Sequence, residues 1–93
     1  MGPRARDLGV VIGRLGPGPR NAITDVDGVS VGHATVVRDE PSVARTGVTA
    51  IWPHPGDPWR ERMYAGTAIV NGYGELIGID QISEWGLLHS PVV

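Results

Sequence analysis

The residues best suited to chemistry lie in a glycine-rich stretch that reads Asn71-Gly72-Tyr73-Gly74-Glu75-Leu76-Ile77-Gly78. Its glycines let a ligand approach the backbone closely, and the Glu75 carboxylate could accept a hydrogen bond from an ammonium group. Asn71 and Glu75 flank these glycines and are therefore the candidate substrate-binding residues. The competing interpretation is structural, with Glu75 capping the helix expected to follow and satisfying its first free N–H groups.

The same glycine loop lies between an expected strand and an expected helix, which is the placement of a dinucleotide-binding loop. Its spacing is G-x-G-x-x-x-G, one residue longer than the usual fingerprint, and Glu75 would bring a carboxylate close to the phosphates. The acidic residue that such loops carry about 20 positions further on cannot be checked in this sequence. A nucleotide-binding fragment of an oxidoreductase is thus an alternative, less favoured than a plain glycine turn.

Other catalytic and metal-binding patterns are missing from the sequence. There is no cysteine, and the three histidines (His33, His54 and His89) are too widely spaced for a metal motif. Asp25-Val26-Asp27-Gly28 lacks the third acid and the closing glutamate of a calcium loop, so it is predicted to be a turn. No serine lies in a G-x-S-x-G elbow. We therefore assign no metal, no cofactor and no catalytic residue.

Charge and hydropathy narrow the possible partners. The formal net charge of −2 is spread along the chain, which favours neither nucleic acid nor an anionic membrane as a partner. No apolar run approaches the roughly 20 residues of a membrane span. Arg4 and Arg6 are followed by Asp7 and a glycine-broken apolar stretch, which makes a poor secretory signal. A cytoplasmic location is the default expectation.

Glycine and proline, 14 and 8 of 93 residues, punctuate short apolar runs and predict a strand-rich chain with tight turns. We expect an extended N-terminal arm over residues 1–20, in which residues 8–12 could form a short strand. Further strands are expected at residues 29–38, 47–52 and 65–71. Residues 89–93 are typical of a turn that opens another strand.

One helix is expected from residue 79, because apolar residues recur there every three positions: Ile79, Ile82, Trp85 and Leu88. Gly86 indicates an early end. Trp85, on the apolar stripe, is predicted to face a core. Trp59, in the proline-rich loop, is predicted to be more exposed, at a site entrance or a subunit contact. His33 is expected to be a core or edge histidine within a strand.

Residues 21–33 read N-A-I-T-D-V-D-G-V-S-V-G-H, a turn that feeds a strand. Asp27-Gly28 is the strongest short turn signal in the chain, because glycine takes a positive φ without steric cost.

The amino-acid sequence of residues 21–33 resembles the start of the L-aminopeptidase/D-esterase and β-peptidyl aminopeptidase family of self-processing serine hydrolases. Three further blocks resemble family segments in the same order: Arg4-Ala5-Arg6-Asp7-Leu8-Gly9, Arg45-Thr46-Gly47-Val48-Thr49-Ala50-Ile51 and Asn71-Gly72-Tyr73-Gly74-Glu75-Leu76. Ile77 departs from the threonine expected there, and residues 53–62 resemble a family-variable loop.

The resemblance implies an α/β (α+β) fold, the strand-rich N-terminal portion of a four-layer α-β-β-α sandwich similar to N-terminal-nucleophile hydrolases. Residues 1–93 would form a single incomplete domain. The implied activity removes N-terminal residues from short peptides, amino-acid amides or esters, through a serine that self-cleavage makes N-terminal. No position here matches that serine motif, so the missing downstream part of the chain would supply it, and the segment alone is expected to be inactive.

The family resemblance also implies a homo-oligomer for the full-length enzyme. A different class remains open beside it, a stand-alone small binding domain. That alternative predicts cooperative unfolding of residues 1–93 by themselves, whereas a fragment with exposed strand edges should aggregate or stay partly unfolded.

Overall fold

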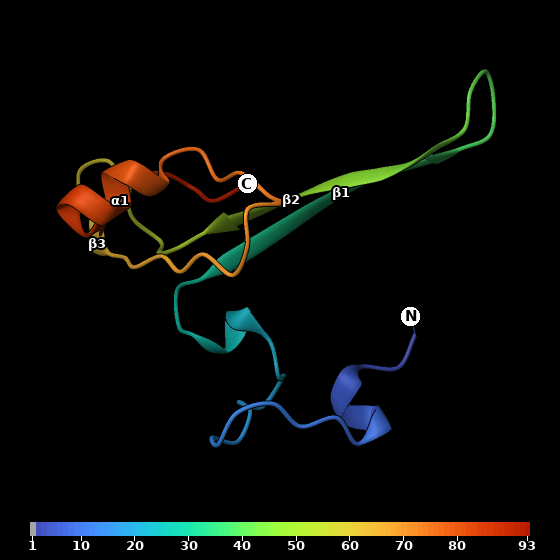
Figure 1. Ribbon diagram of the computed structural model, residues 1–93, viewed down its shortest axis with the longest axis horizontal. Coiled ribbons are helices and arrows are strands. Elements are labelled where there is room, and N and C mark those ends of the chain that lie inside the picture. The colour runs from blue at the N-terminus through green and yellow to red at the C-terminus, as the bar shows by residue number, and fades with distance from the viewer. Residues whose placement is uncertain (1) are drawn as a thin grey trace.

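The computed structural model describes residues 2–93, and its most regular element is a long antiparallel hairpin (Figure 1). Strands β1 (Ser30–Arg38) and β2 (Ala44–Trp52) pair without interruption from Ser30↔Trp52 to Arg38↔Ala44. Their valines, threonines and isoleucine suit a pleated surface. The predicted strand at 29–38 is confirmed, and the one at 47–52 is confirmed with an earlier start, because residues 44–46 continue the pairing with β1.

The turn before β1 forms where the sequence predicts it. The short 3₁₀ helix η2 (Ile23–Asp25) precedes it, and the Val29 N–H donates to the Val26 carbonyl oxygen at 3.2 Å. Gly28 has a φ of +85°, a left-handed conformation that glycine adopts without steric penalty. The Asp25 carboxylate accepts hydrogen bonds from the backbone N–H groups of Arg20 and Ala22, which close the loop ahead of η2.

A second, smaller unit contains the helix. Helix α1 (Ile79–Trp85) ends at Gly86, whose φ is +68° and whose N–H donates to the Ile82 carbonyl at 2.7 Å. The predicted early end at Gly86 is therefore confirmed. Strands β3 (Met63–Tyr64) and β4 (Leu87–Leu88) then pair in antiparallel register beside the helix. Figure 1 shows this unit at the base of the hairpin, whose tip projects away from it.

The predicted strand at residues 65–71 is wrong. The Ala65 N–H donates to the Gly86 carbonyl at 2.9 Å, after which the chain leaves the small sheet. An extended segment becomes a strand only when its backbone groups find a partner. Within residues 2–93 no strand pairs with 66–71. The apolar residues of this segment therefore predict a strand, but the described chain supplies no neighbouring strand to pair with it.

The N-terminal stretch folds back on the turn before β1 (Figure 1). It contains a 3₁₀ helix, η1 (Ala5–Leu8), whose Asp7 carboxylate accepts a hydrogen bond from the Arg4 N–H at 2.9 Å. The Arg4 guanidinium donates to the carbonyl oxygens of Arg20 and Asn21. These bonds tie the first turn of the chain to residues 20–21. The possible strand at residues 8–12 does not form, because Leu8 belongs to η1 and residues 9–12 are irregular.

Within residues 2–93 no hydrophobic side chain is fully buried. Trp85, expected in a core, is 54% exposed, so that prediction is wrong. Trp59 is 61% exposed, as expected. The described elements make up a small mixed α/β unit with two separate two-stranded antiparallel sheets. None of its helices has the length and apolar character needed to cross a bilayer.

Candidate functional site

Asn71 and Glu75 line the same cavity. It is open to solvent, has a volume of about 860 Å³ and is bounded by residues 66–72, 74–77 and 79. Most of the lining is apolar, with side chains of Ile69, Val70, Leu76, Ile77 and Ile79. The structure thus brings the two candidate residues to one cavity, and their binding of a substrate stays a prediction.

Asn71 shapes the loop that it begins. Its Oδ1 accepts a hydrogen bond from the Tyr73 N–H at 3.1 Å, an Asx-type turn in which the side chain replaces a backbone acceptor. The amide nitrogen keeps two N–H donors for other contacts. The Tyr73 side chain is 100% exposed, so this turn is held by the asparagine rather than by packing of the aromatic ring.

Glu75 does not cap the helix, so the predicted capping role is wrong. The residue that caps α1 is Gly78, with a φ of +92°, and no side chain bonds to the first N–H groups. The Ile79 N–H donates instead to the Leu76 carbonyl at 3.3 Å. Within residues 2–93 the Glu75 carboxylate takes part in none of the three ion pairs. A carboxylate at the edge of an apolar cavity is suited to receive a cationic group.

The structural basis for a dinucleotide-binding loop is missing. That arrangement needs a strand that leads directly into the glycine loop, and the predicted strand at 65–71 does not form. The helix after the loop, α1, has only seven residues. We therefore abandon the oxidoreductase interpretation of residues 72–78.

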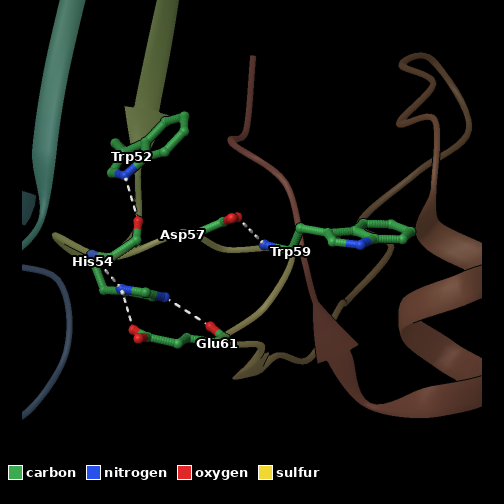
Figure 2. Close-up of polar contacts among 6 residues, drawn as sticks. Trp52, His54, Asp57, Trp59 and Glu61 are labelled. Atoms are coloured by element: carbon green, nitrogen blue, oxygen red, sulfur yellow. Dashed lines mark hydrogen bonds and ion pairs between the residues drawn. The ribbon is translucent and has the colours of Figure 1, made fainter.

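A second ordered group of polar residues, which the sequence pattern did not indicate, lies in the proline-rich loop after β2. Figure 2 shows His54 at its centre. The His54 Nδ1 accepts the Gly56 N–H at 2.8 Å, and Nε2 lies 2.7 Å from the Glu61 carbonyl oxygen. Because a backbone N–H can only donate, Nδ1 is the acceptor, and Nε2 carries the proton that it donates to Glu61. This pattern fixes the neutral ring in one tautomer.

The rest of this loop is closed by a turn and by Trp52. The Trp52 indole N–H donates to the Gly56 carbonyl at 3.3 Å, and the Asp57 carboxylate accepts the Trp59 N–H at 2.9 Å (Figure 2). The Asp57 carbonyl accepts hydrogen bonds from the N–H groups of Arg60 and Glu61. Asp-Pro at the first two positions of a turn is a signal that could have identified this loop in the sequence.

An arginine joins this loop to the helix. The guanidinium carbon of Arg62 lies 5.8 Å from the ring centre of Trp59 and 5.9 Å from that of Trp85, within the range of cation–π interaction. The ring of Trp59 also meets His89 edge-on, with centroids 4.8 Å apart. These contacts hold the loop, α1 and the segment after β4 together without burying any of them completely.

The remaining histidine and the serines show no catalytic arrangement. His33, as expected for an edge histidine, contacts a neighbour on the facing strand, with its Nδ1 2.9 Å from Thr49 Oγ1. In the part of the chain that the structure describes, the one serine side chain with a polar partner is Ser83, which meets Thr67 Oγ1 at 3.5 Å. Among residues 2–93, no group of three or more His, Asp or Glu residues is placed so that it could hold a metal ion.

Comparison with known proteins gives concordant matches. Residues 21–93 match the sequence model of Peptidase family S58. The β-peptidyl aminopeptidase BapA of Sphingosinicella xenopeptidilytica is 44% identical over 97 residues, which cover 98% of this chain and 24% of that protein. The BapA of Sphingosinicella microcystinivorans is 42% identical over 98 residues, with 99% and 24% coverage. The chain thus spans about a quarter of the length of these relatives.

A solved structure has a similar fold. The crystal structure of the PH0078 protein from Pyrococcus horikoshii OT3 superimposes with a TM-score of 0.78 and 43% sequence identity. The match covers 94% of this chain and 26% of the other. Nearly all of this chain therefore has a counterpart in a protein chain that is about four times as long.

Proposed function

This chain belongs to peptidase family S58, and we propose that it is the N-terminal segment of a self-processing serine aminopeptidase of that family. The observation that carries the proposal is the 44% identity to a β-peptidyl aminopeptidase over 98% of the chain. The complete fold would be a four-layer α-β-β-α sandwich, to which this segment contributes the hairpin, the small sheet and α1. Its location in the cytoplasm and its assembly as a homo-oligomer are further parts of the proposal.

The reaction is nucleophilic acyl transfer. A serine supplied by the rest of the enzyme attacks the amide or ester carbonyl of a short substrate with a free amino end, and water then releases the acyl-enzyme. Hydrogen-bond donors around the carbonyl stabilise the negative charge that develops on its oxygen. The present chain contributes no catalytic residue, and residues 1–93 alone are inactive.

The glycine loop forms one wall of the substrate pocket. Glu75 takes no part in the ion pairs of the described residues and lies beside an apolar cavity, so its carboxylate receives the substrate ammonium while the apolar lining contacts the attached side chain. Asn71 holds the loop in shape through its bond to the Tyr73 N–H. Aminoacyl amides, esters and short peptides all present the amino group that this arrangement selects.

The absence of a buried core supports a segment rather than a stand-alone binding domain. A small independent domain needs a packed hydrophobic interior, and no hydrophobic side chain is fully buried in residues 2–93. The largest exposures include Ile77 at 99%, on the same loop as Glu75. A larger fold would cover these side chains and complete the pocket.

Kinetics of the longer hydrolase that the proposal requires, with this segment at its N-terminus, test the proposal. Glu75→Gln should raise KM for aminoacyl amides and β-peptides by roughly 10- to 100-fold, because it removes a charge-assisted hydrogen bond. Glu84→Gln, an exposed carboxylate on α1, is the matched control and should leave KM unchanged. Hydrolysis by residues 1–93 alone, or a reading frame that stops at Val93, would contradict the proposal.

A further inference from the structure

The outer edge of β2 already makes one pairing. The Ile51 N–H donates to the Val92 carbonyl at 2.8 Å, and the Val92 N–H donates to the Ile51 carbonyl at 3.0 Å. This reciprocal pair is antiparallel. It lies on the side of β2 that faces away from β1, since the backbone groups of one strand residue point to the same side in an antiparallel sheet.

The same alternation leaves a row of free backbone groups beside it. Because Ile51 directs its N–H and carbonyl outward, so do Thr49, Gly47 and Arg45, at every second position of β2. No backbone hydrogen bond outside the hairpin reaches these three residues within residues 2–93. The edge is therefore regular and unoccupied for most of its length.

We propose that this edge receives a third strand, antiparallel to β2, formed by the segment that continues from Val93 in the longer hydrolase. The register follows from the Ile51↔Val92 pair. The second, fourth and sixth residues after Val92 exchange hydrogen bonds with Thr49, Gly47 and Arg45 respectively. This inference rests on the proposed function, since it requires the remainder of the enzyme.

Direction and sequence argue for this occupant. An antiparallel strand that enters at Ile51 runs through Val93 towards the tip of the hairpin, which is the direction in which the chain leaves Val92. Edges that stay free in soluble proteins are interrupted by proline, charged side chains or a bulge. β2 contains no proline, its pairing with β1 is continuous over nine pairs, and its one charged residue, Arg45, lies at the far end near the hairpin tip. The matched relatives are about four times as long as this chain, which provides the polypeptide required.

Amide hydrogen exchange of the longer protein tests the edge directly, without any variant. The outward N–H groups of Thr49 and Gly47 should exchange at least roughly 100-fold more slowly than in an unstructured peptide, like the inward groups of Val48 and Ala50. Rapid exchange of the outward groups would overturn the proposal. Protection that disappears on dilution to the monomer would also overturn it, because the occupant would then be a second copy.

Paired substitutions identify which edge is used. Thr49→Ala and His33→Ala each remove the same side-chain contact across the hairpin, whereas Thr49→Pro and His33→Pro each remove one outward N–H, on β2 and on β1. Thr49→Pro, relative to Thr49→Ala, should lower the melting temperature of the longer protein by roughly 5 °C more than His33→Pro does relative to His33→Ala. Equal effects of the two proline substitutions would sink the proposal. Since both readouts are structural, an inactive enzyme with a protected edge would refute only the proposed function.

Discussion

Gly28 and Pro55 approach each other so closely that a side chain on the glycine would not fit. A Cβ atom built on Gly28 would lie 2.8 Å from the Pro55 Cδ. The turn before β1 and the proline-rich loop after β2 are therefore in contact at Gly28, where there is room for a hydrogen atom but not for a side chain. The close approach joins the two ends of the hairpin at its base.

Replacing Gly28 by alanine should destabilise the protein more than the same change at Gly13. Both glycines have a positive φ, +85° and +86°, but nothing lies within 4 Å of a Cβ on Gly13. Gly13→Ala should cost about 1 kcal/mol, the conformational penalty alone. Gly28→Ala should cost about 2–3 kcal/mol, because the clash with Pro55 is added. Urea denaturation of the longer protein measures both losses in the free energy of unfolding. Equal losses would show that the proline-rich loop moves aside at no energetic cost.

His54→Ala should loosen the proline-rich loop. The ring is half-buried and serves two backbone groups, so its removal should cost about 1–2 kcal/mol and speed amide exchange at Gly56. His54→Asn offers an acceptor near the position of Nδ1 and should restore part of the protection at Gly56. Unchanged exchange at Gly56 in the alanine variant would show that the turn at Asp57 alone holds the loop.

Arg62→Met should weaken the contact between the loop and α1. Methionine keeps much of the apolar stem but loses the charge that faces Trp59 and Trp85, so the free energy of unfolding should fall by about 1 kcal/mol. Arg62→Lys should recover part of this loss. Arg60→Met is the control, since its exposed ion pair with Asp57 should contribute less than about 0.5 kcal/mol. Tryptophan emission follows each transition, and equal effects of the two methionine variants would argue against the cation–π contact.

Asn71 should act on substrate binding through the shape of the loop. Asn71→Ala removes the acceptor of the Tyr73 N–H and should raise KM of the longer enzyme several-fold, with a smaller change in kcat. Asn71→Asp keeps an acceptor at the same place and should preserve the turn, so its KM should stay near that of the parent. An alanine variant with normal KM would mean that the glycine loop holds its shape without this bond.

The sequence was sufficient to predict those elements that depend only on residues close to them in the chain. The hairpin follows from β-branched residues on both sides of a turn, and each strand is the partner of the other. The end of α1 follows from Gly86, because a left-handed cap is a property of one residue. The family blocks quoted from the sequence lead to peptidase family S58, which matches residues 21–93.

Predictions failed where an element depends on a distant partner. Residues 65–71 are apolar enough for a strand, but no strand of residues 2–93 pairs with residues 66–71. Trp85 lies on an apolar stripe whose other residues are half-buried, yet its own side chain stays 54% exposed within residues 2–93. The contacts of His54 could not be predicted from the sequence, because its ring bonds to backbone groups, which every residue type carries. Asn71 and Glu75 could be placed together from the sequence because they belong to one short loop, and their role in binding stays a prediction.

The uncovered apolar side chains have a consequence for biosynthesis. A hairpin forms in about 1–10 μs, whereas a ribosome adds about 5–20 residues per second, so β1 and β2 can pair as soon as both have left the exit tunnel. In the longer hydrolase proposed above, side chains such as Val70 and Ile77, both almost completely exposed in this segment, would be covered only by polypeptide that is translated later. Slowing translation of that later part would then lengthen the period in which the nascent segment can aggregate.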